Sequence, residues 1–223
     1  MRTIKKVASH IFIDGFGGMT QGLFATLIIG TMIQQIGLLI GSSTGNVIYL
    51  LGKAAAALTS AGIGVGVAVK YGESPLVTVS AAVAAMVGGY AGKITGGTFF
   101  VDGNAVLAGP GEPLGAFIAA FAGITCGHLV SGKTKVDIIV TPVITIGAGS
   151  VVGLLVGPPI SQMMTGLGSI INWATEQRPF IMGIVVSVVM GMVLTLPISS
   201  AALGIILNLS GLAAEFVFPI TCN

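Results

Sequence analysis

The chain has 223 residues, of which 54% are hydrophobic and 7% are charged, and its mean hydropathy is +1.03. Soluble domains carry about 25% charged residues, so this composition indicates a membrane protein with several spans and excludes a soluble catalytic domain within the chain. The net charge of +2 is too small and too scattered for a nucleic-acid-binding protein.

Three apolar runs before the middle of the chain predict membrane helices: Gly15–Ile40, Val47–Val69 and Pro75–Tyr90. Within the first run, the part from Met19 onward is long enough to cross a bilayer. Basic residues precede this span and favour a cytoplasmic N-terminus, namely Arg2, Lys5 and Lys6.

The second run contains one lysine and a set of closely spaced glycines. Lys53 is expected to extend its charged end to the membrane surface, with a role in a substrate pathway as the alternative. Gly62, Gly64 and Gly66 predict either a smooth face for close helix packing or an unwound turn.

The sequence Ala-Gly-Pro-Gly-Glu-Pro-Leu-Gly, residues 108–115, interrupts the apolar pattern at the centre of the chain. Gly109, Pro110 and Gly111 cannot continue a regular helix without a break. Pro113 suits the first turn of a new helix, so Glu112 is expected at a helix N-terminus, where free N–H groups attract acceptor oxygens. A non-helical segment at membrane depth must be satisfied by protein or by a wet cavity. The sequence therefore predicts a re-entrant hairpin near residues 105–115 that lines a substrate site, or alternatively an interfacial loop whose glutamate faces water.

The helix predicted after this break, Leu114–Val130, carries His128 near its far end. Glu112 and His128 are 16 positions apart, or about 24 Å along a straight helix. The two side chains cannot meet at one site unless the segment bends. An interfacial, structural role is the plainer interpretation of His128.

The rest of the chain predicts one span over Asp137–Val156, ended by Gly157-Pro158-Pro159, and an amphipathic helix over Ile160–Glu176. Two further apolar segments follow, Phe180–Leu196 and Ser199–Ala214. The fold class expected is therefore all-α, a single membrane-embedded domain over residues 1–223 with six to seven hydrophobic segments. Lysines at positions 70, 133 and 135 fall on the cytoplasmic side of this topology, in agreement with the positive-inside tendency.

The chain is rich in glycine, alanine and serine up to Ala214. The last nine residues, Glu-Phe-Val-Phe-Pro-Ile-Thr-Cys-Asn, differ from this composition. This change predicts a chain that is truncated or frame-shifted at its C-terminal end relative to a longer protein. Reading the gene through the stop and finding no further apolar spans would refute that hypothesis. Cys126 and Cys222 form no metal or disulfide pattern, and no metal ligand, cofactor or catalytic residue is expected.

Four motifs taken together resemble the EIIC-type membrane proteins of the bacterial phosphotransferase system, and more narrowly the branch that includes perfringolysin-regulator-like proteins. They are Gly-Pro-Gly-Glu-Pro-Leu-Gly (109–115), Ser-Gly-Lys-Thr-Lys-Val-Asp (131–137), Gly-Pro-Pro-Ile-Ser (157–161) and Leu-Pro-Ile-Ser-Ser-Ala-Ala (196–202). The resemblance covers roughly residues 1 to 214.

The resemblance implies a sugar permease subunit in a bacterial cell membrane, whose sugar is phosphorylated by a separate EIIB protein supplied by EIIA. The chain itself carries no phosphoryl group, so any enzymatic role is shared with those partners. Family members bind sugar through the glutamate of a Gly-x-x-Glu-Pro element, which here corresponds to Gly109, Glu112 and Pro113. Gly111 lies in the same turn, and His128 is a further substrate-binding candidate. The resemblance also implies a homodimer.

Two other functions remain open on the residues alone. One is a membrane sensor or regulator that kept the EIIC fold without transport. The other is an ion-coupled transporter for another small polar solute. A neighbouring response gene without genes for EIIA or EIIB favours the sensor. Uptake that depends on a proton or sodium gradient but not on phosphoenolpyruvate favours the ion-coupled transporter.

Overall fold

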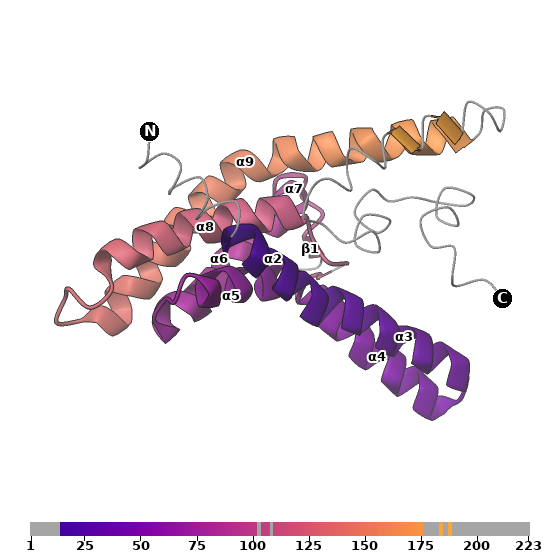
Figure 1. Ribbon diagram of the computed structural model, residues 1–223, viewed down its shortest axis with the longest axis horizontal. Helices are drawn as coiled ribbons and strands as arrows, with labels where there is room; N and C mark the ends of the chain where they lie inside the picture. Colours follow the sequence, from indigo (N-terminus) through magenta and orange to yellow (C-terminus); the bar gives the residue numbers. More distant parts are fainter. Residues whose placement is uncertain (1–13, 102–103, 108, 176–182, 185–186, 189–223) are drawn as a thin grey trace. The chain divides into compact units, whose positions relative to one another are not determined.

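The computed structural model describes residues 14–101, 104–107, 109–175, 183–184 and 187–188 (Figure 1). The chain divides into two units between Ile160 and Ser161. The elements described, in chain order, are α2 (Phe16–Leu23), the π-helical η2 (Phe24–Ile28), α3 (Ile29–Ile40), α4 (Ser43–Ala57), α5 (Thr59–Lys70), α6 (Pro75–Gly89), α7 (Ala91–Thr95), β1 (Phe100–Val101), β2 (Asn104–Ala105), α8 (Pro113–Val130) and α9 (Asp137–Thr175).

The first predicted span is present as a helical run over Phe16–Ile40, formed by α2, η2 and α3. It ends at Gly41, whose φ of 60° lies in the left-handed region that glycine adopts without strain. The Ser42 side chain then accepts a hydrogen bond from the Gly45 N–H and caps α4. α3 and α4 consequently lie side by side as an antiparallel pair (Figure 1).

The predicted second span, Val47–Val69, is interrupted, because α4 and α5 meet at Leu58 with a bend of 53°. The two helices are either one broken span or a re-entrant loop. The side-chain hydroxyls of Thr59 and Ser60, the two residues after the break, form hydrogen bonds to backbone carbonyls. Thr59 donates to the Ala56 carbonyl at 2.6 Å, and Ser60 donates to a carbonyl 50 residues away in the sequence. Such local bonds compete with the regular backbone ladder.

Small residues let the helices of the first unit approach closely. A Cβ on Gly18 of α2 would lie 2.5 Å from the Gly66 carbonyl oxygen of α5, and one on Gly64 would lie 2.5 Å from the Ala81 carbonyl oxygen of α6. The close-packing interpretation of the α5 glycines is therefore confirmed. The core between α5, α6 and α8 is similarly made of buried small side chains, among them Ala81, Ala84, Ala85, Ala116, Ala119 and Ala120.

The predicted end of a helix at Gly157-Pro158-Pro159 is also wrong, because α9 continues through these residues to Thr175. A proline inside a helix costs about 3 kcal/mol, and membrane helices tolerate it where neighbouring elements fix the backbone. Here a Cβ on Gly157 would collide with the Ala91 side chain, so α9 packs directly on α7 at this point. The predicted amphipathic segment is part of the same long helix.

The part of the chain that the structure describes contains three helices long and apolar enough to cross a membrane, or four if the bent pair α4–α5 is one span. This is fewer than the six to seven segments predicted. α6 has 15 residues and is shorter than a full crossing. The predicted segments Phe180–Leu196 and Ser199–Ala214 and the C-terminal change at Glu215 lie outside the described residues, apart from 183–184 and 187–188.

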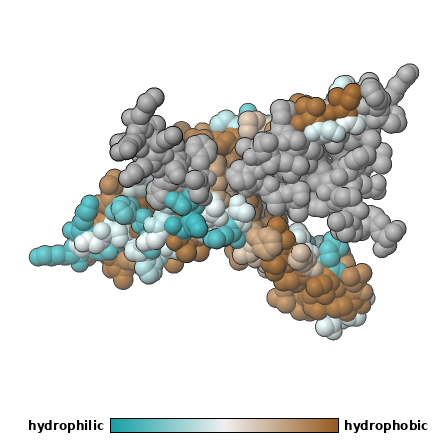
Figure 2. All heavy atoms as spheres, viewed as in Figure 1, coloured by the Kyte–Doolittle hydropathy of each residue, from teal (hydrophilic) through white to brown (hydrophobic). Residues whose placement is uncertain are grey.

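The all-helical class is otherwise confirmed, with a single addition in the part of the chain described: β1 and β2 pair as a short antiparallel hairpin between α7 and α8. Large apolar side chains are exposed over α3 and α4, where Figure 2 shows a hydrophobic surface. Leu39 is 87% exposed, for example, and Leu51 62% exposed. Exposed faces of this kind are expected of helices that contact lipid.

Candidate functional site

The centre of the chain forms a tight turn, as its sequence predicts. Gly109 has a φ of 79° and Gly111 a φ of 73°, values that residues with a Cβ rarely adopt. Pro113 opens α8, and Glu112 is its N-cap residue with an extended backbone. The predicted helix start and the predicted position of Glu112 are confirmed. Whether the turn is re-entrant stays a prediction.

Three hydrogen bonds attach this turn to α5, α6 and the residue after α6. The Ser60 hydroxyl donates to the Pro110 carbonyl at 2.9 Å. The Glu112 backbone N–H donates to the Gly89 carbonyl at 2.7 Å, and the Tyr90 hydroxyl donates to the Gly109 carbonyl. The backbone of an irregular segment is thereby satisfied by protein groups, as it must be within a membrane.

Tyr90 occupies the junction between α6 and α7 and is 1% exposed. Its hydroxyl also lies 3.3 Å from the Ala57 carbonyl at the α4–α5 break. The Phe99 ring packs against it at a centroid distance of 5.5 Å, and the Lys93 Nζ lies 5.4 Å from the ring centroid. Tyr90 thus links two helix interruptions to the central turn.

Ser60 and Tyr90 are not identified as site residues by sequence reasoning. Both lie next to small residues in apolar runs, and no spacing rule connects position 60 or 90 to position 110. The only available signal is that each carries a hydroxyl at the point where a helix is interrupted, since a buried hydroxyl requires a partner.

The Glu112 carboxyl group is the ionisable group of the turn over residues 109–113. Its Oε2 atom is buried and makes no hydrogen bond with any described residue. The side chain does not cap α8. A buried acceptor without a partner costs about 1–3 kcal/mol, and more when charged. The Oε2 atom is therefore a free hydrogen-bond acceptor within the part of the chain described, and Glu112 stays a candidate for ligand binding.

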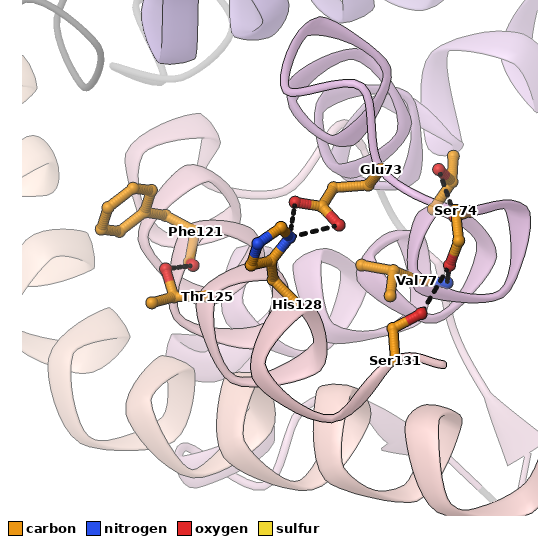
Figure 3. A network of polar contacts seen from close by, with 8 residues as sticks. Glu73, Ser74, Val77, Phe121, Thr125, His128 and Ser131 are labelled. Carbon is orange, nitrogen blue, oxygen red and sulfur yellow. Dashed lines mark hydrogen bonds and ion pairs between the residues drawn. The ribbon is translucent and has the colours of Figure 1, made fainter. Parts of the chain in front are cut away.

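His128 lies at the opposite end of α8 from Glu112, so the structure does not bring the two together. Its Nδ1 atom is 3.0 Å from Oε1 of Glu73, a residue of the loop between α5 and α6 (Figure 3). The His128 side chain is 71% exposed and that of Glu73 only 9%. In the same region, the Ser74 and Ser131 hydroxyls lie 3.1 Å apart. These contacts join the α5–α6 loop to the end of α8 and to Ser131, the residue after it.

The remaining candidates contribute no further chemistry to the turn. Lys53 is exposed on α4, and its extension to the membrane surface stays a prediction. The described residues contain no group of three histidine, cysteine or acidic side chains arranged for a metal ion. Cys126 is a free, partly buried thiol within α8.

Comparison with models of protein families gives a match over residues 13–215 to the family described as Phosphotransferase system, EIIC. No curated protein and no solved structure shows a significant match to the chain. The family match covers most of the chain, including the whole of the site around the central turn.

Proposed function

The chain belongs to the EIIC family of the phosphotransferase system, and on that premise we propose that it is the membrane permease subunit that carries one sugar to a partner EIIB protein for phosphorylation. Membership of the family makes it a multi-pass membrane component of sugar uptake. The proposal adds a bacterial cell membrane, a cytoplasmic N-terminus, separate EIIA and EIIB chains, and a homodimer.

One observation supports a sugar site at the central turn: the buried Oε2 atom of Glu112 has no partner among the described residues. A sugar is neutral and rich in hydroxyl groups, and a carboxylate oxygen accepts hydrogen bonds from hydroxyls. Charge-assisted bonds of this kind are about twice as strong as neutral ones. In this role Glu112 contacts the substrate, while Gly109, Gly111 and Pro113 shape the turn that carries it.

The same chemistry provides selectivity among sugars. A substrate that lacks the bonded hydroxyl leaves a buried acceptor without a partner, and sites of this kind reject such analogues strongly. Where the buried turn excludes water, the hydrogen bonds between the carboxylate and the sugar are stronger, and so is the discrimination between sugars.

His128 is a weaker candidate for substrate binding. The length of α8 places it about 24 Å from Glu112, and its Nδ1 atom already contacts the Glu73 carboxylate. Any contact between His128 and the sugar therefore belongs to a different stage of transport from the Glu112 contact.

The proposal is tested by phosphoenolpyruvate-dependent uptake of a panel of labelled sugars in cells that also express EIIA and EIIB partners. We expect one sugar to accumulate in phosphorylated form, and Glu112→Gln to reduce that accumulation while the protein still inserts. Correct insertion with no phosphorylated product from any sugar would contradict the proposal and favour a sensor or an ion-coupled carrier. Light scattering of the purified protein tests the homodimer.

A further inference from the structure

Two hydroxyl-bearing residues outside the central turn hold it in place, and neither is part of the family's glutamate motif. Ser60 belongs to α5 and donates to the Pro110 carbonyl; Tyr90 follows α6 and donates to the Gly109 carbonyl. The acceptors are the two residues immediately before Gly111 and Glu112. We propose that Ser60 and Tyr90 are positioning residues that set where the Glu112 carboxylate is presented to the substrate. This inference rests on the proposed sugar site.

The space around Ser60 supports this role. A Cβ on Gly111 would lie 2.6 Å from the Ser60 Oγ atom, and a Cβ on Gly89 would collide with the same atom. Ser60 itself is 0% exposed. The hydroxyl therefore fills the gap between the turn and the end of α6, so the turn cannot shift toward α5 while Ser60 is present.

The Tyr90 hydroxyl has one proton but two carbonyl acceptors within reach, Gly109 and Ala57. Donation to Gly109 holds the turn, whereas donation to Ala57 holds the end of α4. Tyr90 thereby couples the position of the turn to the bend between α4 and α5. Its phenol ring is buried and packed against Phe99, so its hydroxyl has little freedom to move elsewhere.

The first test needs no substrate. Cys126→Ala and Cys222→Ala remove both native cysteines, and Glu112→Cys then places a single thiol in the turn. The measured quantity is the rate at which N-ethylmaleimide labels this thiol in membranes. Loss of one hydrogen bond of about 1 kcal/mol makes a displaced turn about five times more populated. We expect Ser60→Ala or Tyr90→Phe to raise the labelling rate by about that factor, and the double variant to raise it further.

Matched controls remove hydroxyls that do not touch the turn. Ser80→Ala deletes a buried hydroxyl whose bond is to Leu76 within α6. Tyr71→Phe deletes the hydroxyl of the residue that ends α5, whereas Ser60 lies near the start of that helix. Both controls should leave the labelling rate within about twofold of the parent. Equal rates for the parent, Ser60→Ala and Tyr90→Phe would overturn the proposal.

The second test uses the sugar that the parent accumulates best from the panel. We expect Ser60→Ala and Tyr90→Phe to raise the KM for uptake by about five- to tenfold with little change in the maximal rate per inserted protein. A fall in the amount of inserted protein with an unchanged KM would indicate a purely structural role and would contradict the proposal. If the parent transports no sugar, the proposed function fails, while the labelling rates still decide whether these residues hold Glu112.

Discussion

The backbone N–H of Glu112 donates a 2.7 Å hydrogen bond to the carbonyl of Gly89, the last residue of α6. The start of α8 is thus attached to the end of α6, although the two residues are separated by α7 and a β-hairpin in the sequence. A free carbonyl at the end of one helix and a free N–H at the start of another satisfy each other. The Glu112 side chain makes no capping hydrogen bond to the backbone of α8.

Replacing Glu112 with methionine should raise stability and abolish uptake. Methionine has a similar length and no polar atom, so it removes a buried oxygen that lacks a partner. We expect the melting temperature of the purified protein to rise by a few degrees, at about 2–4 °C per kcal/mol for a chain of this size. Stability and function commonly oppose each other in this way at binding sites. A lower melting temperature would show that the carboxylate stabilises the empty protein.

Gly111→Ala should be more harmful than Gly109→Ala. Both glycines have positive φ, so both substitutions carry a backbone strain of about 1–2 kcal/mol. A Cβ at Gly111 would in addition lie 2.6 Å from the Ser60 Oγ atom, whereas a Cβ at Gly109 meets nothing within 4 Å. We expect both the melting temperature and the rate of uptake to be lower in Gly111→Ala than in Gly109→Ala. Equal decreases in the two variants would argue against close packing of Gly111 against Ser60.

Gly18→Ala should destabilise the protein, and the neighbouring Gly17→Ala should not. A Cβ on Gly18 would lie 2.5 Å from the Gly66 carbonyl oxygen, while the nearest atom to a Cβ on Gly17 is a flexible Lys70 side-chain carbon at 3.8 Å. Alanine also favours a helix over glycine by about 1 kcal/mol. We expect a lower melting temperature for the first variant and an unchanged or higher one for the second. A tolerated Gly18→Ala would mean that α2 and α5 are not in close contact.

The contact between His128 and Glu73 should contribute little to stability. The His128 side chain is 71% exposed, whereas that of Glu73 is 9% exposed. Water around the imidazole screens the contact, and ion pairs at the surface are worth about 0.2–1 kcal/mol. A double-mutant cycle with His128→Ala and Glu73→Ala should give a coupling energy in that range. The KM for sugar should also stay within about twofold in His128→Ala, because α8 separates this residue from Glu112 by about 24 Å. A large rise in KM would instead assign His128 to the substrate pathway.

Local features of the sequence determine much of this protein. Length and hydropathy predict the helical runs of the first unit, because a lipid-facing helix needs a long apolar segment. Glycine and proline predict the turn at Gly109–Pro113, because their effect on φ and on backbone hydrogen bonding acts within a few residues. The position of Glu112 at the start of α8 follows from the same local rules.

Only the tertiary structure decides which distant groups meet. Ser60 reaches a carbonyl 50 residues away, Tyr90 one 19 residues away, and Glu73 a histidine 55 residues away. The break at Leu58 and the uninterrupted helix through Pro158 also depend on neighbouring helices, since packing and distant hydrogen bonds outweigh local propensity there. Local sequence thus specifies the turn that carries Glu112, whereas the packing of α5 and α6 determines where that carboxylate lies.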